Sequence, residues 1–234
     1  MKIVKKILFY IDSFINLLFP RLCLVCGKSI SKNEKYICVS CLYYLPLTNL
    51  QCKKDNIITQ MFWGRLQIEY ATALFYYNKS NNYSLLLYSL KYSGMKDLAF
   101  YLGQILGTTL ESSSLFSDID VILPVPLHPK KKKIRGYNQS EWIVYGIVSV
   151  FKREVSIDNL YRRTFTNTQT KKSRLERWEN VSGKFALRDY NAIKNKHILI
   201  VDDVITTGAT IEACAEVLLR VEGVKISLAT LAKA

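Results

Sequence analysis

The sequence predicts an α/β fold in which helices flank a mostly parallel sheet, with a small cysteine-rich module before it. Two patterns carry this prediction. From residue 70 onward, short apolar runs typical of buried strands alternate with stretches of helical periodicity, the order expected of a parallel sheet covered on both faces. Ahead of them, between Cys23 and Cys41, stand two C-x-x-C pairs with the spacing of a metal site.

The α/β region, residues 70–234, divides into elements by periodicity and by capping residues. Asn138 followed by Glu141, and Ser173 followed by Glu176, are capping-box pairs that each predict the start of a helix. The expected strands are Tyr70–Tyr77, Asp120–Pro126, His197–Val201 and Val224–Leu231, the expected helices are Asn82–Tyr92, Asp97–Leu110, Asn138–Phe151 and Ala209–Glu222, and Tyr161–Lys172 is expected to be a loop.

Residues 1–20 are predicted to form an amphipathic helix that Pro20 ends. Its stripe of apolar residues is open to two partners, the neighbouring domain or a membrane surface. Asp12 and Asn16 interrupt the apolar run, so a signal peptide is not expected. No other stretch approaches the roughly 20 apolar residues of a spanning helix. We therefore expect a cytoplasmic protein without a transmembrane segment.

Residues 21–50 are predicted to be a zinc-binding module. Two C-x-x-C turns can arrange four thiolates tetrahedrally around Zn²⁺, and the chain has no secretory features that would favour disulfides. A closed four-thiolate site has no open coordination position, so the zinc is expected to be structural or to form a binding platform. Cys52 and Cys214 are expected to be bystanders, and residues 51–69 are expected to be a linker. The predicted ligands are Cys23, Cys26, Cys38 and Cys41.

The charge of the chain indicates a class of partner. The 234 residues include 33 Lys and Arg against 19 Asp and Glu, which gives a formal net charge of +14. This balance favours a polyanionic partner such as nucleic acid, a membrane surface or a phosphorylated ligand. A merely basic protein is the alternative, and charge alone does not choose between them.

The segment Ile198–Thr210 carries most of the functional information. Apolar strand residues lead into two adjacent carboxylates, and small hydroxyl and glycine residues then open a helix. Ligands of open α/β sheets bind at the carboxyl ends of strands, where this turn is expected. A helix N-terminus offers unpaired N–H groups to a phosphate, while ionised carboxylates accept hydrogen bonds from ribose hydroxyls. The residues predicted to hold a phosphorylated ribose are Asp202, Asp203, Val204, Thr206, Thr207, Gly208, Ala209 and Thr210.

This pattern resembles the signature of type I phosphoribosyltransferases. The resemblance implies binding of 5-phosphoribosyl-1-pyrophosphate with Mg²⁺, and displacement of pyrophosphate from ribose C1. Asp202 and Asp203 would then stabilise positive charge on the ribose, and Mg²⁺ with Lys or Arg would stabilise the leaving pyrophosphate. In the hypoxanthine-guanine branch an aspartate stands where this chain has Thr206, so that route of purine salvage is disfavoured.

Further segments resemble the ComF competence family, whose members join an N-terminal zinc module to this domain. The resemblance implies a link to the uptake of transforming DNA. Two hypotheses stay open: a Mg²⁺-dependent phosphoribosyltransferase with an unknown acceptor, or a non-catalytic protein that binds a nucleotide or single-stranded DNA and acts with a helicase-type partner. The matching segments are LFPRLCLVCG at 18–27, PVPLHPKKKKIRGYNQS at 124–140, RRTFTNTQTKKSRLERWENVSGKF at 162–185 and VDDVITTGAT at 201–210.

Basic residues in two segments are candidates for binding phosphate groups. The run Lys130–Lys133 is expected to bind pyrophosphate, to bind nucleic acid or to face solvent. Arg135 is the better candidate, because a guanidinium can bind phosphate through two hydrogen bonds. The segment Arg162–Arg174 resembles the flexible loop that closes over pyrophosphate in this fold. Its candidates are Arg163, Gln169 and Arg174, and the catalytic candidates overall are Asp202, Asp203, Arg135 and Arg163.

Three other residues are noted without a catalytic assignment. Lys91 matches a position of the family but has no chemical role that the sequence explains. His197 begins a strand and is expected to be structural, whereas His128 lies between apolar and basic stretches and is a candidate for contact with a ligand. Neither histidine has a carboxylate partner nearby in sequence, so a histidine general base is disfavoured.

Overall fold

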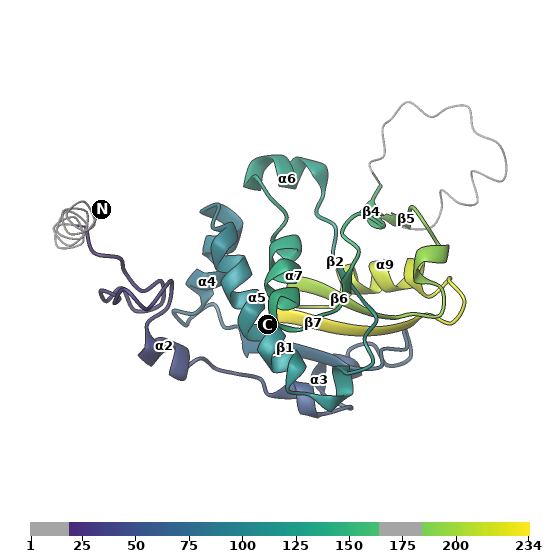
Figure 1. The fold of residues 1–234 in the computed structure, drawn as a ribbon, viewed down its shortest axis with the longest axis horizontal. Helices are drawn as coiled ribbons and strands as arrows, with labels where there is room; N and C mark the ends of the chain where they lie inside the picture. Colours follow the sequence, from purple (N-terminus) through teal and green to yellow (C-terminus); the bar gives the residue numbers. More distant parts are fainter. Residues whose placement is uncertain (1–18, 164–183) are drawn as a thin grey trace, which may run out of the picture.

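The computed structural model describes residues 19–163 and 184–234 and contains a five-stranded parallel sheet (Figure 1). The strand order is β1-β7-β6-β2-β3, and every neighbouring pair is parallel. A separate antiparallel pair, β4 and β5, lies beside it. The strands are β1 (Ala71–Tyr76), β2 (Val121–Pro124), β3 (Glu154–Val155), β4 (Leu160–Arg162), β5 (Phe185–Leu187), β6 (His197–Ile205) and β7 (Lys225–Lys233). The predicted α/β class is confirmed.

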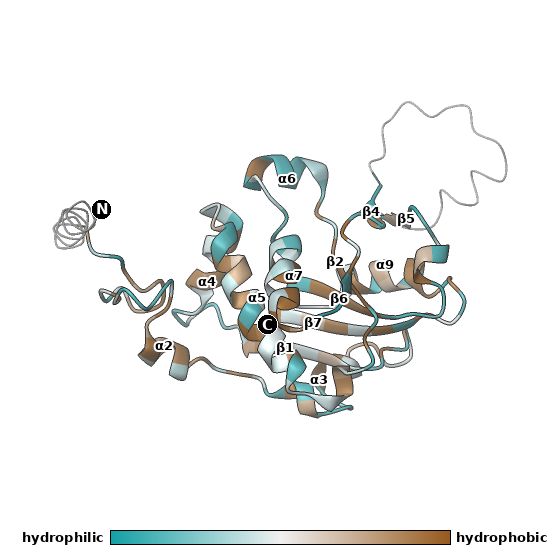
Figure 2. Cartoon of the chain, in the orientation of Figure 1, coloured by the Kyte–Doolittle hydropathy of each residue, from teal (hydrophilic) through white to brown (hydrophobic). Residues whose placement is uncertain are grey.

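Strand β6 lies in the interior of the sheet. It pairs with β2 on one side, where Val121 lies opposite Ile198, and with β7 along its whole length on the other side. Its first five residues are all buried, as expected for an apolar run covered on both faces. Figure 2 shows the hydrophobic colour along these inner strands.

Helices cover both faces of the sheet and divide the buried side chains into two cores. One core lies under α4, α5 and α7 and includes Leu90, Leu102 and Ile147. The other lies under α3 and α9 and includes Ile58 and Cys214. The helices are α2 (Val39–Tyr43), α3 (Ile57–Gln60), α4 (Ser84–Tyr92), α5 (Lys96–Glu111), α6 (Pro129–Arg135), α7 (Gln139–Val150) and α9 (Ala209–Leu218), with short 3₁₀ turns η1 (Leu50–Cys52), η2 (Ser114–Phe116) and η3 (Asn191–Ile193).

Glycines allow α5 and α7 to pack backbone against backbone. A Cβ added at Gly146 of α7 would lie 2.1 Å from the carbonyl oxygen of Phe100 on α5. A Cβ added at Gly103 of α5 would lie 2.3 Å from the carbonyl oxygen of Ile143 on α7. Only hydrogen fits at such separations, so these glycines fix how closely the two helices cross and therefore where the N-terminus of α7 lies.

The cysteine-rich module packs directly on the first core. Val25, Ile37 and Leu45 are buried and join the same cluster as the side chains of α4 and α5. The hydroxyl of Tyr83 donates a hydrogen bond to the carbonyl oxygen of Cys41 at 2.8 Å. Just after the module, Leu47 forms a β-bridge with Phe75 at the outer edge of β1. The module is thus attached to the sheet rather than joined only by chain connectivity.

The stretch 51–69, expected to be a linker, packs on the other face of the sheet. It contains α3, whose N-cap Asn56 accepts hydrogen bonds from the backbone of Ile58 and Thr59 in a full capping box. The side chains of Ile58 and Phe62 are completely buried. The mixed composition of residues 51–69 did not indicate this packing, because the residues that become buried are few and widely spaced. The boundaries of the four predicted segments stay a prediction.

Most expected elements are found within a few residues of their predicted limits, with three differences. Tyr161 and Arg162 belong to β4 instead of a loop, because they pair with β5. Helix α9 ends at Leu218 rather than continuing to Glu222. The lysine run lies on α6, a short helix closed by Gly136 with φ of 79°. Residues 1–18 of the helix predicted at 1–20, and the helix predicted after Ser173, fall outside the described residues.

Among the described helices, none combines the length and the apolar character that crossing a lipid bilayer requires.

Replacing Gly146 with Ala should destabilise the protein strongly, because the new methyl group would overlap the backbone of α5. We expect a loss of about 2 kcal/mol or more in the free energy of unfolding, measured by urea denaturation. Thr108→Ala, on the exposed side of α5, is the matched control and should change stability far less. Equal stability of the Gly146→Ala variant and the wild type would contradict the close packing of these helices.

Candidate functional site

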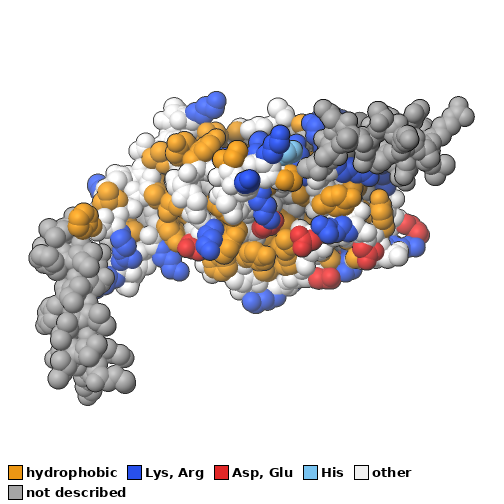
Figure 3. Space-filling view, turned by 90° about the horizontal axis from the view of Figure 1, so that it is seen from above, with side chains coloured by type: hydrophobic (Ala, Val, Ile, Leu, Met, Phe, Trp, Pro, Cys, Tyr) orange, Lys and Arg blue, Asp and Glu red, His pale blue; other side chains and the backbone are white. Residues whose placement is uncertain are grey.

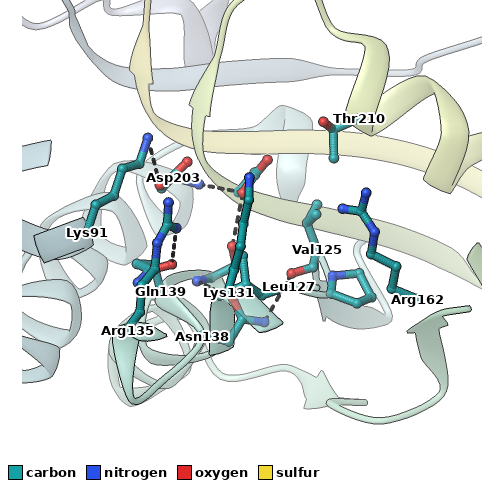
Figure 4. A pocket seen from close by; sticks show the side chains of 13 residues that line it. Lys91, Val125, Leu127, Lys131, Arg135, Asn138, Gln139, Arg162, Asp203 and Thr210 are labelled. Atoms are coloured by element: carbon teal, nitrogen blue, oxygen red, sulfur yellow. Dashed lines mark hydrogen bonds and ion pairs between the residues drawn. The ribbon is translucent and has the colours of Figure 1, made fainter. Parts of the chain in front are cut away.

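A pocket of about 170 Å³ opens at the carboxyl ends of β2 and β6, the edge that the sequence predicts for ligand binding (Figure 4). Its lining residues come from α4, the loop after β2, α6, the start of α7, β4, β6 and α9, which are far apart in the chain. The lining residues are Lys91, Val125, Pro126, Leu127, Lys131, Arg135, Asn138, Gln139, Ser140, Arg162, Asp202, Asp203 and Thr210. Two carboxylates and four cationic side chains therefore share one small space.

The two adjacent aspartates have different partners. Asp202 Oδ1 accepts a hydrogen bond from the hydroxyl of Ser140 at 3.0 Å and another from the backbone N–H of Asp203 at 2.9 Å. Asp203 Oδ2 lies 3.2 Å from Nζ of Lys91, an ion pair that is largely shielded from solvent. This pairing gives Lys91 the role that the sequence did not explain.

Burial, and after it the neighbouring charge of Asp203, raise the pKa of Asp202 to about 7. The hydrogen bonds from Asp203 and Ser140 and the charge of Lys91 act in the opposite direction. A cation or hydrogen-bond donor that enters the pocket reduces the repulsion between the two carboxylates, so binding of such a group is favoured.

Two arginines line the pocket from different sides. Arg135 at the end of α6 donates from Nη1 to Oε1 of Gln139 at 2.8 Å, which orients its guanidinium. Arg162 reaches in from β4 on the other side of the pocket (Figure 4). The predicted candidate Arg163 does not line this pocket, and its backbone N–H bonds to the carbonyl of Lys184.

The predicted phosphate loop forms a second, smaller hollow next to the first. It has a volume of about 40 Å³ and is lined by Asp202 and the residues from Val204 to Ile211. Gly208 adopts φ of 80° and is the N-cap of α9, so the unpaired N–H groups of the helix start there. Asp202 and Thr210 line both hollows. The acidic pair and the helix N-terminus therefore form one continuous site.

The lysine run on α6 is solvent-exposed at all four positions (Figure 3 shows the basic side chains on this face). Only Lys131 lines the pocket. Lys132 forms an ion pair of 3.0 Å with Glu141 of α7, and the backbone N–H of Lys130 donates to Nδ1 of His128. His128 is thus the N-cap of α6. The alternatives of pyrophosphate, nucleic acid and solvent stay open for the remaining lysines.

His197 lies at the opposite, amino end of β6. It is buried, with Nε2 2.9 Å from the hydroxyl of Ser227 and Nδ1 3.1 Å from a carboxylate oxygen of Asp118. Because ligands of this fold bind at the carboxyl ends of the strands, these contacts describe a structural residue.

The four predicted zinc ligands converge in space. Their sulfur atoms all lie within 4.8 Å of one another, and the sulfurs of Cys26 and Cys38 are 3.8 Å apart. Four sulfurs at the usual zinc distance of about 2.3 Å in a tetrahedron stand about 3.8 Å apart. Gly27, with φ of 71°, closes the first C-x-x-C turn through its N–H bond to the carbonyl of Cys23. The cluster can therefore hold a metal ion.

Backbone N–H groups surround the sulfur atoms of this cluster. The N–H of Cys38 donates to the sulfur of Cys23 at 3.3 Å, and that of Cys41 donates to the sulfur of Cys38 at 3.4 Å. Burial raises the pKa of the Cys23 thiol, but hydrogen bonds from the backbone N–H groups of Cys38, Cys26 and Val25 outweigh burial and lower it to about 6. A thiol that ionises readily and already accepts hydrogen bonds is suited to zinc binding, since the thiolate is the ligand form.

Comparisons with known proteins find one matching domain family and several relatives. Residues 143–234 match the family described as phosphoribosyl transferase domain. A DNA utilization protein YhgH of Escherichia coli O157:H7 is 28% identical over 204 residues, which cover 85% of this chain and 84% of the relative. Competence protein F of Haemophilus influenzae is 31% identical over 117 residues, covering 49% of this chain and 51% of the relative.

Solved structures similar to this chain include two enzymes, each at low sequence identity. A glutamine phosphoribosylpyrophosphate amidotransferase from B. subtilis is 19% identical with a TM-score of 0.38, and the match covers 56% of this chain but 25% of that one. A hypoxanthine-guanine phosphoribosyltransferase from Bacillus anthracis is 13% identical with a TM-score of 0.34, covering 59% of this chain and 68% of that one.

If the cysteine cluster is a zinc site, purified protein should carry about one equivalent of zinc by elemental analysis, since a four-thiolate site holds one ion. Cys26→Ser should lose most of that zinc and loosen the packing of residues 21–45. Cys52→Ser is the control and should keep it, because Cys52 lies outside the cluster. Metal-free protein with four reduced cysteines and an ordered N-terminal module would contradict this assignment.

Proposed function

The chain belongs to the ComF family of proteins with a phosphoribosyltransferase domain, and on that premise we propose that it binds 5-phosphoribosyl-1-pyrophosphate at the carboxyl edge of its sheet. One observation supports this most strongly. An acidic pair, a helix N-terminus and several cationic side chains line two adjoining hollows that share Asp202 and Thr210. A ligand with a diol between phosphate groups at both ends matches that order of donors and acceptors.

Each part of the ligand has a proposed partner. The 5′-phosphate binds the N–H groups and hydroxyls of Thr206–Thr210 at the start of α9. The 2′- and 3′-hydroxyls donate to Asp202 and Asp203. The pyrophosphate accepts from Lys91, Arg135 and Arg162, which line the larger hollow. Arg163 stays a candidate for the same charge.

The residues present also fit a magnesium ion, which prefers oxygen ligands and usually binds through carboxylates together with substrate phosphates. Asp202 and Asp203 supply carboxylate oxygens at the pocket wall. When bound, Mg²⁺ supplies positive charge that stabilises the pyrophosphate as it leaves. The structural role of zinc at Cys23, Cys26, Cys38 and Cys41 belongs to the same proposal.

The proposed reaction is a displacement at ribose C1. A bond forms between C1 and a nucleophile while the bond from C1 to pyrophosphate breaks, and pyrophosphate leaves with the electron pair. The carboxylates of Asp202 and Asp203 stabilise the positive charge that develops on the ribose, and the cations stabilise the leaving group. The names of the relatives, competence protein F and DNA utilization protein, support a role in the uptake or use of DNA. A cytoplasmic location belongs to the same proposal.

Replacing Asp202 and Asp203 together with Asn should weaken binding of 5-phosphoribosyl-1-pyrophosphate by about tenfold or more, because the amides keep the size but lose charge-assisted acceptance. Isothermal titration calorimetry measures the affinity, and circular dichroism and zinc content should not change. Glu154→Gln, at the amino end of the sheet, is the control and should bind as the wild type does. Unaltered affinity of the double variant would show that the acidic pair is misassigned.

A second candidate function is binding of single-stranded DNA, favoured by the surface around the pocket. Exposed lysines of α6 stand near the end of α4, since the hydroxyl of Tyr137 and the amide of Gln139 both donate to the carbonyl of Leu90. On α4 the exposed rings of Tyr88 and Tyr92 lie 4.8 Å apart. Lysines beside exposed aromatic rings are typical of single-strand binding.

Replacing all four of Lys130–Lys133 with Gln separates the roles of the lysine run. If the run binds nucleic acid, affinity for single-stranded DNA falls, and the log–log salt slope decreases by roughly 0.7 for each lost phosphate contact. Binding of 5-phosphoribosyl-1-pyrophosphate then survives; if the run binds pyrophosphate, the pattern reverses. The control replaces four lysines near the amino ends of the strands, Lys152, Lys194, Lys196 and Lys225. No change in either measurement would assign the run to solvent.

A further inference from the structure

The phosphate loop rests on an aromatic ring from outside the matched domain. A Cβ added at Gly208 would lie 2.8 and 2.9 Å from Cζ and Cε1 of Phe62. Real Cβ atoms do not approach other atoms so closely, so only glycine fits against this ring. Phe62 itself is completely buried. The ring and the loop therefore fix each other's position.

The segment that precedes the sheet holds Phe62 in place through hydrogen bonds. Its backbone N–H bonds to the carbonyl of Thr59 at 3.0 Å, and its carbonyl accepts from Leu66 at 2.9 Å. Asn56, which caps the short helix α3, also donates from Nδ2 to the carbonyl of Ala71 on β1 at 2.9 Å. The segment is thus anchored to the edge strand of the sheet at one end and to the phosphate loop at the other.

Arg65 adds a second link between this segment and the phosphate loop. Its guanidinium carbon lies 5.7 Å from the centre of the Phe62 ring, and Nη1 forms an ion pair of 2.6 Å with Glu212. The backbone N–H of Glu212 in turn donates to the carbonyl of Gly208 at 2.9 Å. Phe62 therefore contacts Gly208 directly, and Arg65 is linked to Gly208 through Glu212.

We infer that Phe62 is a positioning residue for the phosphate loop: its ring holds Gly208 in the left-handed conformation and so directs the N–H groups of Thr207–Ile211 toward the phosphate site. The ligand part of this inference rests on the proposed function. A smaller side chain leaves space beneath Gly208, and the loop then samples other conformations before it can bind. The segment expected to be a linker is accordingly part of the ligand site.

The test compares Phe62→Leu with the control Ile58→Val. Ile58 is buried on the same segment, but its atoms are not among those nearest to a Cβ at Gly208. Isothermal titration calorimetry with 5-phosphoribosyl-1-pyrophosphate, and hydrogen exchange of the Thr206–Ile211 amides, are measured on the full chain. Phe62→Leu should weaken binding by about tenfold and speed that exchange, while Ile58→Val changes binding less than about twofold. If Phe62→Leu does not fold, Phe62→Met takes its place.

A double-mutant cycle with Gly208→Ala tests the contact itself. Gly208→Ala should weaken binding strongly in the wild-type background and should cost less affinity in the Phe62→Leu background, because the backbone strain is the same in both and the overlap with the ring is relieved. Additive losses, equal losses in the Phe62 and Ile58 variants, or wild-type affinity with wild-type exchange in Phe62→Leu would each overturn the inference. If the wild type binds no 5-phosphoribosyl-1-pyrophosphate, the proposed function fails and the exchange rates alone decide the role of Phe62.

Discussion

The parallel pairing of β6 with β2 and β7 is the constraint on which the rest of the structure depends. It buries the first residues of β6 on both faces of the sheet. It also places Asp202 and Asp203 toward the carboxyl end of the strand. Because the neighbouring strands end at the same edge, the loop after β2 and the start of α9 lie beside the acidic pair. The chemistry of the site thus follows from strand direction as much as from residue type.

Holding two carboxylates close together costs free energy, and the neighbouring side chains offset only part of that cost. Lys91 pairs with Asp203, and Ser140 donates to Asp202, yet burial still raises the pKa of Asp202. Ser140 reaches Asp202 because α7 packs against α5 through glycine contacts that set its position. A pocket with two close carboxylates on one wall and excess cations on the other suits the ligand proposed above, which carries both hydroxyl donors and phosphates.

The site extends beyond the part of the chain that matches the phosphoribosyl transferase domain, residues 143–234. Lys91 and Arg135 come from earlier elements, and Phe62 supports the phosphate loop from the segment before the sheet. The cysteine module packs on α4, the helix that carries Lys91, through Tyr83 and the shared core. The cysteine cluster, which can hold a metal ion, is therefore connected to the site through packed side chains.

The sequence by itself determined the α/β class, the cysteine cluster and the acidic pair with its phosphate loop, because each depends on short-range periodicity or on residues adjacent in the chain. Only the tertiary structure decided which distant residues meet them. The ion pair of Lys91 with Asp203, the choice of Arg162 over Arg163 at the pocket and the ring of Phe62 under Gly208 join residues far apart in sequence. Such contacts depend on strand order, strand alternation and helix crossing, which the global packing of the core fixes and local sequence does not encode.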